Sequence, residues 1–260
     1  MNAKILGSGG LTLVLGHGYG SSQALWDYLL PDLIKRYRVV LFDWSFSSSI
    51  EPSIDFDTSR YSSYGAFSED LISLMDDMNL REVIFVGHSM AGMIGCIAAI
   101  RRPDLFSHLV LVGASPRYLD EEGYEGGLKR SEVDEILSAM ESNYQKWAKS
   151  FAPPLIGVNH PDSIEKFMQD FLRMRPEIAL SVGKMVFMSD FRDVLEKVEV
   201  PCTIVQCADD IVVPTSVAHY MQSKIKGRVS LEIIKSGHCP PLTAPQLLID
   251  ILDRVLISGN

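Results

Sequence analysis

The segment VIFVGHSMAGMIGC, residues 83–96, places one serine, Ser89, between an apolar run and a stretch of small residues. A serine at a tight turn from a strand into a helix can act as a nucleophile, because the turn exposes its hydroxyl group. Such a turn is strained, so the positions two before and two after the serine must be small. Gly87 and Ala91 meet this condition, although glycine is more usual than alanine at the second position. The pattern predicts Ser89 as a catalytic nucleophile.

A serine nucleophile needs a general base and an acid that orients the base. In a strand-turn-helix fold of this kind the acid follows the serine in the chain, and the histidine comes last. His238, in KSGHCPP, comes directly after the last strand-like run and is predicted as the base. Asp209 and Asp210 are adjacent in CADDIVVP. Asp210 is predicted as the acid because it stands four residues before Pro214, a usual spacing after this strand in folds with such a triad. Asp209 is interpreted as a solvated turn residue.

Two backbone amides are candidates to stabilise the oxyanion that forms when a serine attacks a carbonyl group. Met90 directly follows the serine, at the start of the predicted helix. Tyr19 lies in LGHGYG, residues 15–20, the loop after the first strand-like run, where His17 is predicted to orient the loop. The glycines of this loop could also suggest a dinucleotide site. The third glycine of that pattern would fall on Ser21, so the sequence favours an oxyanion loop.

Six short runs rich in Val, Ile and Leu must supply the elements that position these residues. The runs are continuous rather than alternating in hydrophobicity, which favours strands buried on both faces of a parallel sheet. Helix-like stretches separate the early runs, so the order is β-α-β-α, which is typical of a doubly wound α/β architecture. The predicted strands are 11–16, 38–43, 82–87, 108–113, 202–207 and 230–235, and the predicted helices are 23–35, 64–78 and 92–101.

Strand-like runs stop at residue 116 and resume near residue 200, which indicates an inserted layer of helices. Aromatic residues recur at helical spacing in this stretch. A helical layer over the carboxyl ends of parallel strands covers the place where ligands bind, so some of these aromatic residues are expected to face a cavity. We therefore predict a core of residues 1–116 and 191–260 and an inserted lid of residues 117–190.

The composition argues against several classes of function. With a formal net charge of −9 and no basic stripe, the 260-residue chain is not expected to bind nucleic acid. The longest apolar stretch, residues 90–100, is too short to span a bilayer, and the N-terminus lacks the apolar region of a signal peptide. Four cysteines form no CxxC pair, which favours a reducing compartment. No metal-binding motif is present, so we expect neither a metal nor a cofactor.

Seven stretches along the chain resemble the plant α/β-hydrolase receptors for strigolactones and karrikins and, more distantly, the bacterial stress-response hydrolase RsbQ. They are LGHGYGSSQALW, YRVVLFD, FVGHSMAGMIG, RPDLFSHLVLVGASPRYL, SNYQKWAKSFAP, MRPEIALSV and GHCPPLTAP. The resemblance implies an α/β-hydrolase fold, with a mostly parallel doubly wound sheet and an inserted four-helix lid over an apolar ligand pocket. By position, the resemblance also implies five residues of the pocket lining, which are Tyr118, Trp147, Phe151, Phe167 and Phe187.

The resemblance also implies a function for the predicted triad of Ser89, Asp210 and His238. The expected activity is slow hydrolysis of a small apolar butenolide or lactone, in plant hormone signalling of the strigolactone or karrikin kind. The expected partners are an F-box subunit of a ubiquitin ligase and a transcriptional repressor, which contact a monomer in the cytoplasm and nucleus. Two alternatives stay open: a hormone-binding receptor with little or no turnover, and a general carboxylesterase.

Three stretches depart from the usual family pattern. Residues 44–48, WSFSS, stand where Asn-Met-Gly-Ala-Gly is usual, and here the chain resembles the DWARF-14-like-2 branch. Met-Ala-Gly follows the serine where Val-Ser-Ala is usual, which predicts a bulkier pocket floor at Met90. Cys239, Pro240 and Pro241 stand where Leu-Pro-Gln is usual, which predicts a shifted loop for the histidine.

Overall fold

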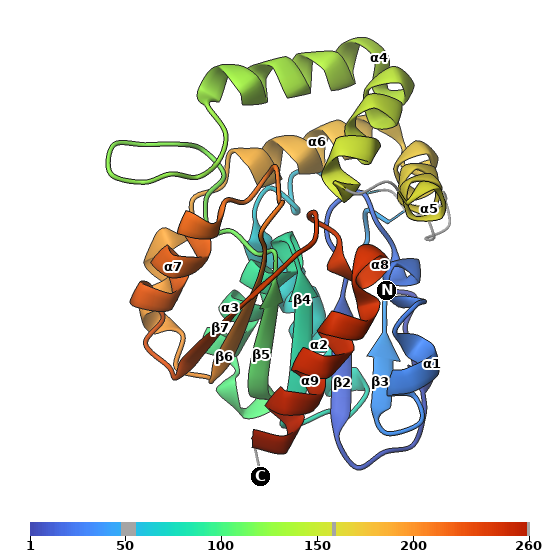
Figure 1. The fold of residues 1–260 in the computed structure, drawn as a ribbon, viewed down its shortest axis with the longest axis vertical. Coiled ribbons are helices and arrows are strands. Elements are labelled where there is room, and N and C mark those ends of the chain that lie inside the picture. The colour runs from blue at the N-terminus through green and yellow to red at the C-terminus, as the bar shows by residue number, and fades with distance from the viewer. Residues whose placement is uncertain (48–55, 158–159, 259–260) are drawn as a thin grey trace.

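A sheet with helices on both faces forms the core (Figure 1). Its strands are β1 (Lys4–Leu6), β2 (Thr12–Gly16), β3 (Arg38–Leu41), β4 (Val83–His88), β5 (Phe106–Val112), β6 (Cys202–Cys207) and β7 (Val229–Ile234). The computed structural model describes residues 1–47, 56–157 and 160–258. Within these ranges the sheet has seven strands in the order β1-β3-β2-β4-β5-β6-β7. β1 pairs antiparallel with β3, and the other neighbouring strands are parallel.

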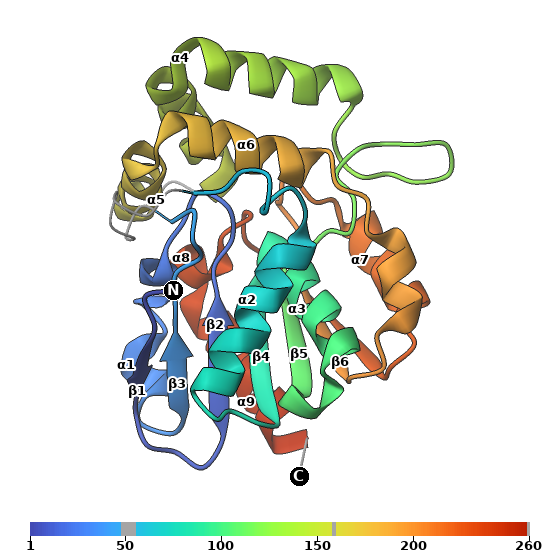
Figure 2. The same ribbon diagram turned by 180° about the vertical axis from the view of Figure 1, so that it is seen from behind.

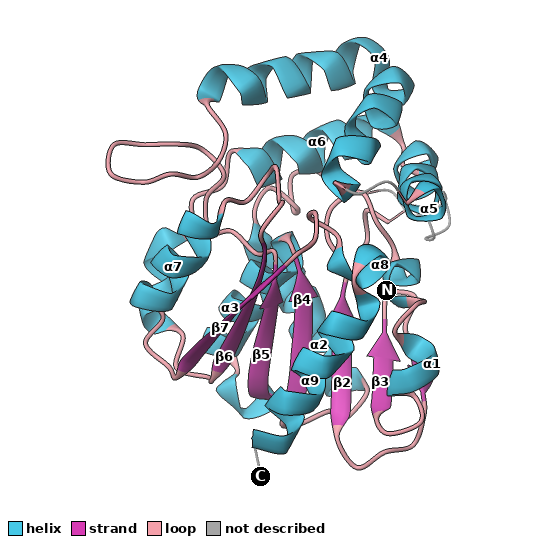
Figure 3. Cartoon of the chain, in the orientation of Figure 1, coloured by secondary structure: helices cyan, strands magenta, loops and turns pink. Residues whose placement is uncertain are grey.

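Helices alternate with the strands along the chain, as Figure 3 shows. They are η1 (Gln23–Trp26), α1 (Leu30–Leu33), α2 (Tyr64–Asp77), α3 (Met90–Arg101), η2 (Pro103–Leu105), α4 (Arg130–Ile156), α5 (Pro161–Arg173), α6 (Pro176–Phe187), η3 (Arg192–Lys197), α7 (Thr215–Lys224), α8 (Pro240–Thr243) and α9 (Pro245–Ser258), where η marks a 3-10 helix. α9 lies over one face of the sheet in Figure 1, and α2 and α3 lie over the other in Figure 2. Among the described residues, no helix is both long and apolar enough to cross a membrane.

The central strands are buried because helices cover both faces of the sheet. Every residue of β4 and of β6 is buried, whereas β7, at the edge, is largely half-buried or exposed. Continuous apolar runs therefore predict the central strands well, because a strand covered on both faces has no polar side. The parallel arrangement also brings the carboxyl ends of β2, β4, β5 and β6 to one edge of the sheet, where the site residues follow the strands.

Two elements of the fold differ from the sequence predictions. No strand is expected at β1, because its three residues form no long apolar run, and the strand is held by its pairing with β3. The stretch 23–35, predicted as one helix, contains the short elements η1 and α1. Pro31 accounts for the break, since its ring would clash with the carbonyl group four residues earlier in a continuous helix. At the second position of α1 the same proline is tolerated.

The insertion between β5 and β6 forms a lid over the carboxyl ends of the strands (Figure 1). Its helices α4, α5 and α6 fall within residues 117–190. Asn143 has φ −157° and ψ 88°, which is not helical, so α4 consists of two helical segments on either side of this residue. The described part of the insertion thus has four helical segments, in agreement with the predicted four-helix lid.

The loop after β2 contacts the lid directly. Gly20 has φ +73°, and a Cβ atom at this position would lie 2.1 Å from Cζ of Phe171 in α5. The Tyr19 hydroxyl group donates a hydrogen bond of 2.7 Å to the carbonyl oxygen of Ala179 in α6. Only glycine fits at such a close approach with positive φ. The loop predicted to carry an oxyanion donor is therefore held between the sheet and two lid helices.

The segment after β3 supports this loop from the other side. Trp44 is fully buried, and its indole N–H donates a hydrogen bond of 2.8 Å to the His17 carbonyl oxygen. The backbone N–H of Trp44 donates to Nε2 of His17 at 3.3 Å, while Nδ1 of His17 donates to the Gly18 carbonyl oxygen at 2.9 Å. Burial lowers the pKa of His17, so a neutral ring with the proton on Nδ1 satisfies both bonds. These bonds allow His17 to orient the loop, as the sequence predicts. Of the segment 44–48, residue 48 lies outside the described residues.

Replacement of Trp44 by phenylalanine tests this support. We expect Trp44→Phe to lower the free energy of unfolding by about 1–3 kcal/mol beyond its packing loss, because the buried His17 carbonyl oxygen loses its donor. Urea unfolding followed by circular dichroism measures this change. Trp26→Phe is the matched control, since Trp26 is equally buried and its indole N–H has no acceptor among the described residues. Equal losses in the two variants would contradict the assigned role of the hydrogen bond.

Candidate active site

Ser89 occupies the sharp turn between β4 and α3. Its backbone has φ +55° and ψ −124°, which is a strained conformation for a residue other than glycine. Its N–H donates a hydrogen bond of 2.8 Å to the Val112 carbonyl oxygen at the end of β5. A Cβ atom at Gly87 would lie 2.7 Å from the backbone of Ala91, so the turn needs glycine at this position. The local structure is the strand-turn-helix that the sequence predicts, with the serine at its apex.

Ser89, His238 and Asp210 come together at the carboxyl edge of the sheet. Ser89 Oγ lies 3.0 Å from Nε2 of His238, and Nδ1 of His238 lies 2.7 Å from Oδ2 of Asp210. A carboxylate can only accept, so Nδ1 of His238 carries the proton and Nε2 is free to accept the serine proton. This is the geometry that a nucleophile, a general base and an orienting acid require.

The position of Asp210 is fixed by backbone groups. Its side chain is fully buried, and Oδ1 accepts hydrogen bonds from the N–H groups of Val212 and Val213 at 2.9 and 3.0 Å. The other carboxylate oxygen is thereby directed at His238. Asp209 is exposed. The structure thus brings Asp210 to the histidine and leaves Asp209 at the surface, as predicted from the spacing to Pro214.

The two predicted oxyanion donors lie on segments that adjoin Ser89. Met90 is the first residue of α3, where a backbone N–H has no acceptor in a preceding turn and is available to an anion. Tyr19 follows Gly18, where a Cβ atom would lie 2.9 Å from Cβ of Ser89. The close approach of this loop requires glycine at position 18. The stabilising role of the two N–H groups is a prediction that the arrangement supports.

A small apolar cavity opens above the serine. It is lined by Tyr19, His88, Ser89, Tyr118, Phe151, Leu155, Phe167, Phe171, Val186, Phe187, Val212 and His238. The cavity volume is about 30 Å³, which is small for a ligand site. Burial raises the pKa of Tyr118 to about 12, so its hydroxyl group, 3.5 Å from Ser89 Oγ, is neutral. The site is a narrow aromatic chamber with few polar groups.

Four of the five predicted pocket residues line this cavity, and Trp147 does not. Its ring stacks on Phe151 at a centroid distance of 4.9 Å and meets the edge of Phe171 at 5.3 Å, so it packs behind the wall. Phe171 lines the cavity without having been predicted, although it belongs to the same helical stripe as Phe167. The Met90 side chain is fully buried in the core and is not part of the lining, so the predicted bulkier pocket floor is wrong.

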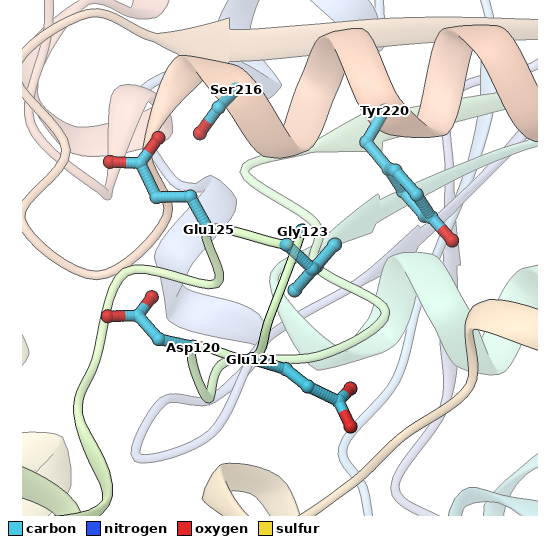
Figure 4. Close-up of a pocket in the computed structure, with 7 residues that line it drawn as sticks. Asp120, Glu121, Gly123, Glu125, Ser216 and Tyr220 are labelled. Carbon is cyan, nitrogen blue, oxygen red and sulfur yellow. The ribbon is translucent and has the colours of Figure 1, made fainter.

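A wider hollow lies away from these residues, between the loop after β5 and helix α7 (Figure 4). Its volume is about 600 Å³, and it is lined by Asp120, Glu121, Gly123, Tyr124, Glu125, Ser216 and Tyr220. None of the triad residues reaches it.

Across the described ranges no cluster of three or more His, Cys, Asp or Glu side chains could hold a metal ion. The groups arranged for chemistry therefore lie in the narrow chamber.

The fold and the site together define a class of protein, the α/β-hydrolases with a serine nucleophile and a helical lid. The alpha/beta hydrolase family model matches residues 13–251. Strigolactone esterase D14 of Arabidopsis thaliana is 42% identical over 98% of this chain and 96% of its own length. Karrikin insensitive 2 receptor CA of Petunia hybrida is 42% identical over 97% of this chain and 94% of its own. The chain belongs to the alpha/beta hydrolase family and, within it, to the group of strigolactone esterases and karrikin receptors.

A solved structure agrees with this assignment. A hydrolase from Oleispira antarctica, olei00960, superposes with a TM-score of 0.94 at 31% sequence identity, covering 99% of this chain and 94% of that one. The superposition extends over the lid as well as the sheet, because almost the whole chain is covered. The insertion is thus part of the shared architecture and not a separate addition.

Asp210→Asn tests the assignment of the acid. We expect the rate constant for reaction of Ser89 with a fluorophosphonate to fall by about 10³- to 10⁴-fold, because an amide holds the histidine in the wrong tautomer. The rate of loss of free enzyme, followed by intact-protein mass spectrometry, measures this. Asp209→Asn is the matched control and should react like the wild type, since its side chain is exposed. A large loss in the Asp209 variant, or none in the Asp210 variant, would reverse the assignment.

Proposed function

We propose that this protein hydrolyses a small apolar ester or lactone of the butenolide type and acts in plant hormone signalling. The observation that carries the proposal is the hydrogen-bonded series of Ser89, His238 and Asp210 at the floor of an aromatic cavity. Relatives with more than 40% identity over nearly the whole chain bear the names strigolactone esterase and karrikin insensitive 2 receptor. The chemistry of the site and the name of the esterase relative support the same reaction.

The reaction proceeds by acyl transfer. Nε2 of His238 takes the hydroxyl proton of Ser89 while Oγ bonds to the carbonyl carbon of the ligand. The N–H groups of Tyr19 and Met90 stabilise the resulting oxyanion. Collapse of this intermediate breaks the ester bond, and the leaving oxygen receives the proton from His238. Water, deprotonated by the same nitrogen, then cleaves the acyl-serine and restores the enzyme.

The cavity favours a small, flat and mostly apolar ligand. Its walls are phenylalanine rings and aliphatic side chains, and its polar groups are gathered around the serine. The cavity is much smaller than a usual ligand pocket of about 300–1,000 Å³, so we propose that ring side chains of the lid move when a ligand binds. Side-chain and lid motion of this kind commonly limits the rate of a cycle. The arrangement supports slow turnover.

A receptor role is the second candidate, because a relative of 42% identity is named as a receptor. A ligand-engaged lid would present a changed surface to an F-box subunit of a ubiquitin ligase and to a transcriptional repressor. A protein with that task would work as a monomer in the cytoplasm and nucleus. In this role the triad serves mainly to engage the ligand, and little or no turnover is needed.

A fluorogenic butenolide probe tests the hydrolase proposal. Under single- and multiple-turnover conditions we expect a burst of product followed by a slow steady state. Ser89→Ala should reduce both phases by at least about 10³-fold, because no other hydroxyl group contacts His238 Nε2 in the described residues. Product fluorescence against time is the measurement. Retained hydrolysis in the folded Ser89→Ala protein would overturn the mechanism, and fast steady turnover of simple esters would favour a carboxylesterase.

Capture of a purified F-box subunit on the immobilised protein tests the receptor role. We expect capture to increase with the concentration of a butenolide ligand, because lid side chains line the cavity and a bound ligand would change the surface of the lid. The bound fraction against ligand concentration is the measurement. Capture that does not respond to ligand would contradict a ligand-driven switch and leave the hydrolase as the whole function.

A further inference from the structure

His238, the predicted base, lies in a loop between β7 and α8 and belongs to no strand or helix. Residues 235–239 follow the end of β7 and precede the start of α8, and none of them belongs to a strand or helix. The distance of 3.0 Å between His238 Nε2 and Ser89 Oγ nevertheless demands a fixed ring. A displacement of about 1 Å between reacting groups can reduce a rate by about 10²-fold. Asp210 holds the ring at Nδ1, and contacts to the backbone of this loop are needed to set the rest of the geometry.

Two hydrogen bonds hold the backbone of His238 on either side of its Cα atom. Its N–H donates to the carbonyl oxygen of Leu155, near the end of α4, at 3.0 Å. Its carbonyl oxygen accepts from Nε2 of His88 at 2.8 Å. The two peptide planes that flank the Cα atom are thus both fixed, and they set the direction of the Cα–Cβ bond. One contact comes from the lid and the other from the residue that precedes the nucleophile.

The state of the His88 ring follows from its partners. A carbonyl oxygen cannot donate, so Nε2 carries the proton and Nδ1 is unprotonated. Nδ1 is buried without a hydrogen-bond partner among the described residues, and it faces Gly18, where a Cβ atom would lie 2.9 Å away. Burial and the nearby His238 lower the pKa of His88 to about 3. His88 is therefore an uncharged donor at physiological pH.

An uncharged donor suits this position because His238 becomes a cation during the reaction. The two rings are 5.0 Å apart between centroids, and the other ionisable groups that act on His88 are Asp210 and His17. A lysine or arginine here would oppose the imidazolium, since like charges at such distances repel in a buried site. The neutral ring supplies the hydrogen bond without that repulsion.

We propose that His88 is a positioning residue, whose Nε2–H fixes the backbone of His238 and so places the base against Ser89. His88 is the last residue of β4, and Ser89 follows it directly. The support of the base is therefore the last residue of the strand that leads into the nucleophile, although His88 and His238 are 150 residues apart in the chain. The inference rests on the proposed hydrolysis.

Two substitutions separate this role from simple packing. His88→Phe keeps a ring of similar size and removes the donor, whereas His88→Gln places an uncharged N–H donor at a similar reach. We expect His88→Phe to lower kcat for the butenolide probe, and the rate of fluorophosphonate reaction, by about 10- to 100-fold with little change in KM. We expect His88→Gln to recover most of this loss. His108→Phe, at the far end of the sheet where His108 bonds Thr203, is the matched control and should keep the wild-type rates.

The outcomes distinguish the inference from the proposed function. A folded His88→Phe protein with wild-type rates, or a His88→Gln protein as slow as His88→Phe at equal Tm, would overturn the role of His88. Activity in Ser89→Ala would instead overturn the proposed hydrolysis. Long-range ¹⁵N–¹H NMR spectra of the wild type provide a test that needs no variant. A proton on Nε2 of His88 across neutral pH supports the inference, and a proton on Nδ1 contradicts it.

Discussion

The strained turn at Ser89 is the constraint on which the site depends. A serine with φ +55° and ψ −124° is tolerated only because β4, α3 and the end of β5 hold it from three sides. The turn excludes a side chain at Gly87 and brings the glycine loop after β2 within contact of the serine. The turn places the hydroxyl group at the carboxyl edge of the sheet, next to the first N–H of α3. The nucleophile and one predicted oxyanion donor thus belong to a single local structure.

The remaining parts of the site reach this turn from distant segments. Asp210 is fixed by two backbone N–H groups, and His238 is fixed by Asp210, by His88 and by the last turn of α4. The bond from His238 to Leu155 joins the base to the lid. A movement of α4 that opens the cavity would therefore also disturb the base, which links ligand entry to catalytic competence.

The sequence predicts the central strands and the triad because each has a local signal. β4 is apolar throughout since both its faces are covered, and the small residues around Ser89 are demanded by its turn. Contacts between distant segments leave no such signal. The pairing of β1 depends on β3, and the hydrogen bond of His88 depends on a residue 150 positions away. The helical spacing of apolar residues predicts which face of α4 is buried. It does not predict which buried side chain reaches the cavity: Phe151 lines it, whereas Trp147 packs against Phe151 outside the lining.

In the proposed mechanism Ser89 carries a covalent acyl group during turnover. This intermediate can be detected by tandem mass spectrometry of protein quenched with acid during the first turnover of a butenolide ester. We expect one acyl group per chain, located on the peptide that contains Ser89, which appears with the burst and decays at the steady-state rate. An acyl group on another residue, or product release with no acylated protein at any time, would contradict it.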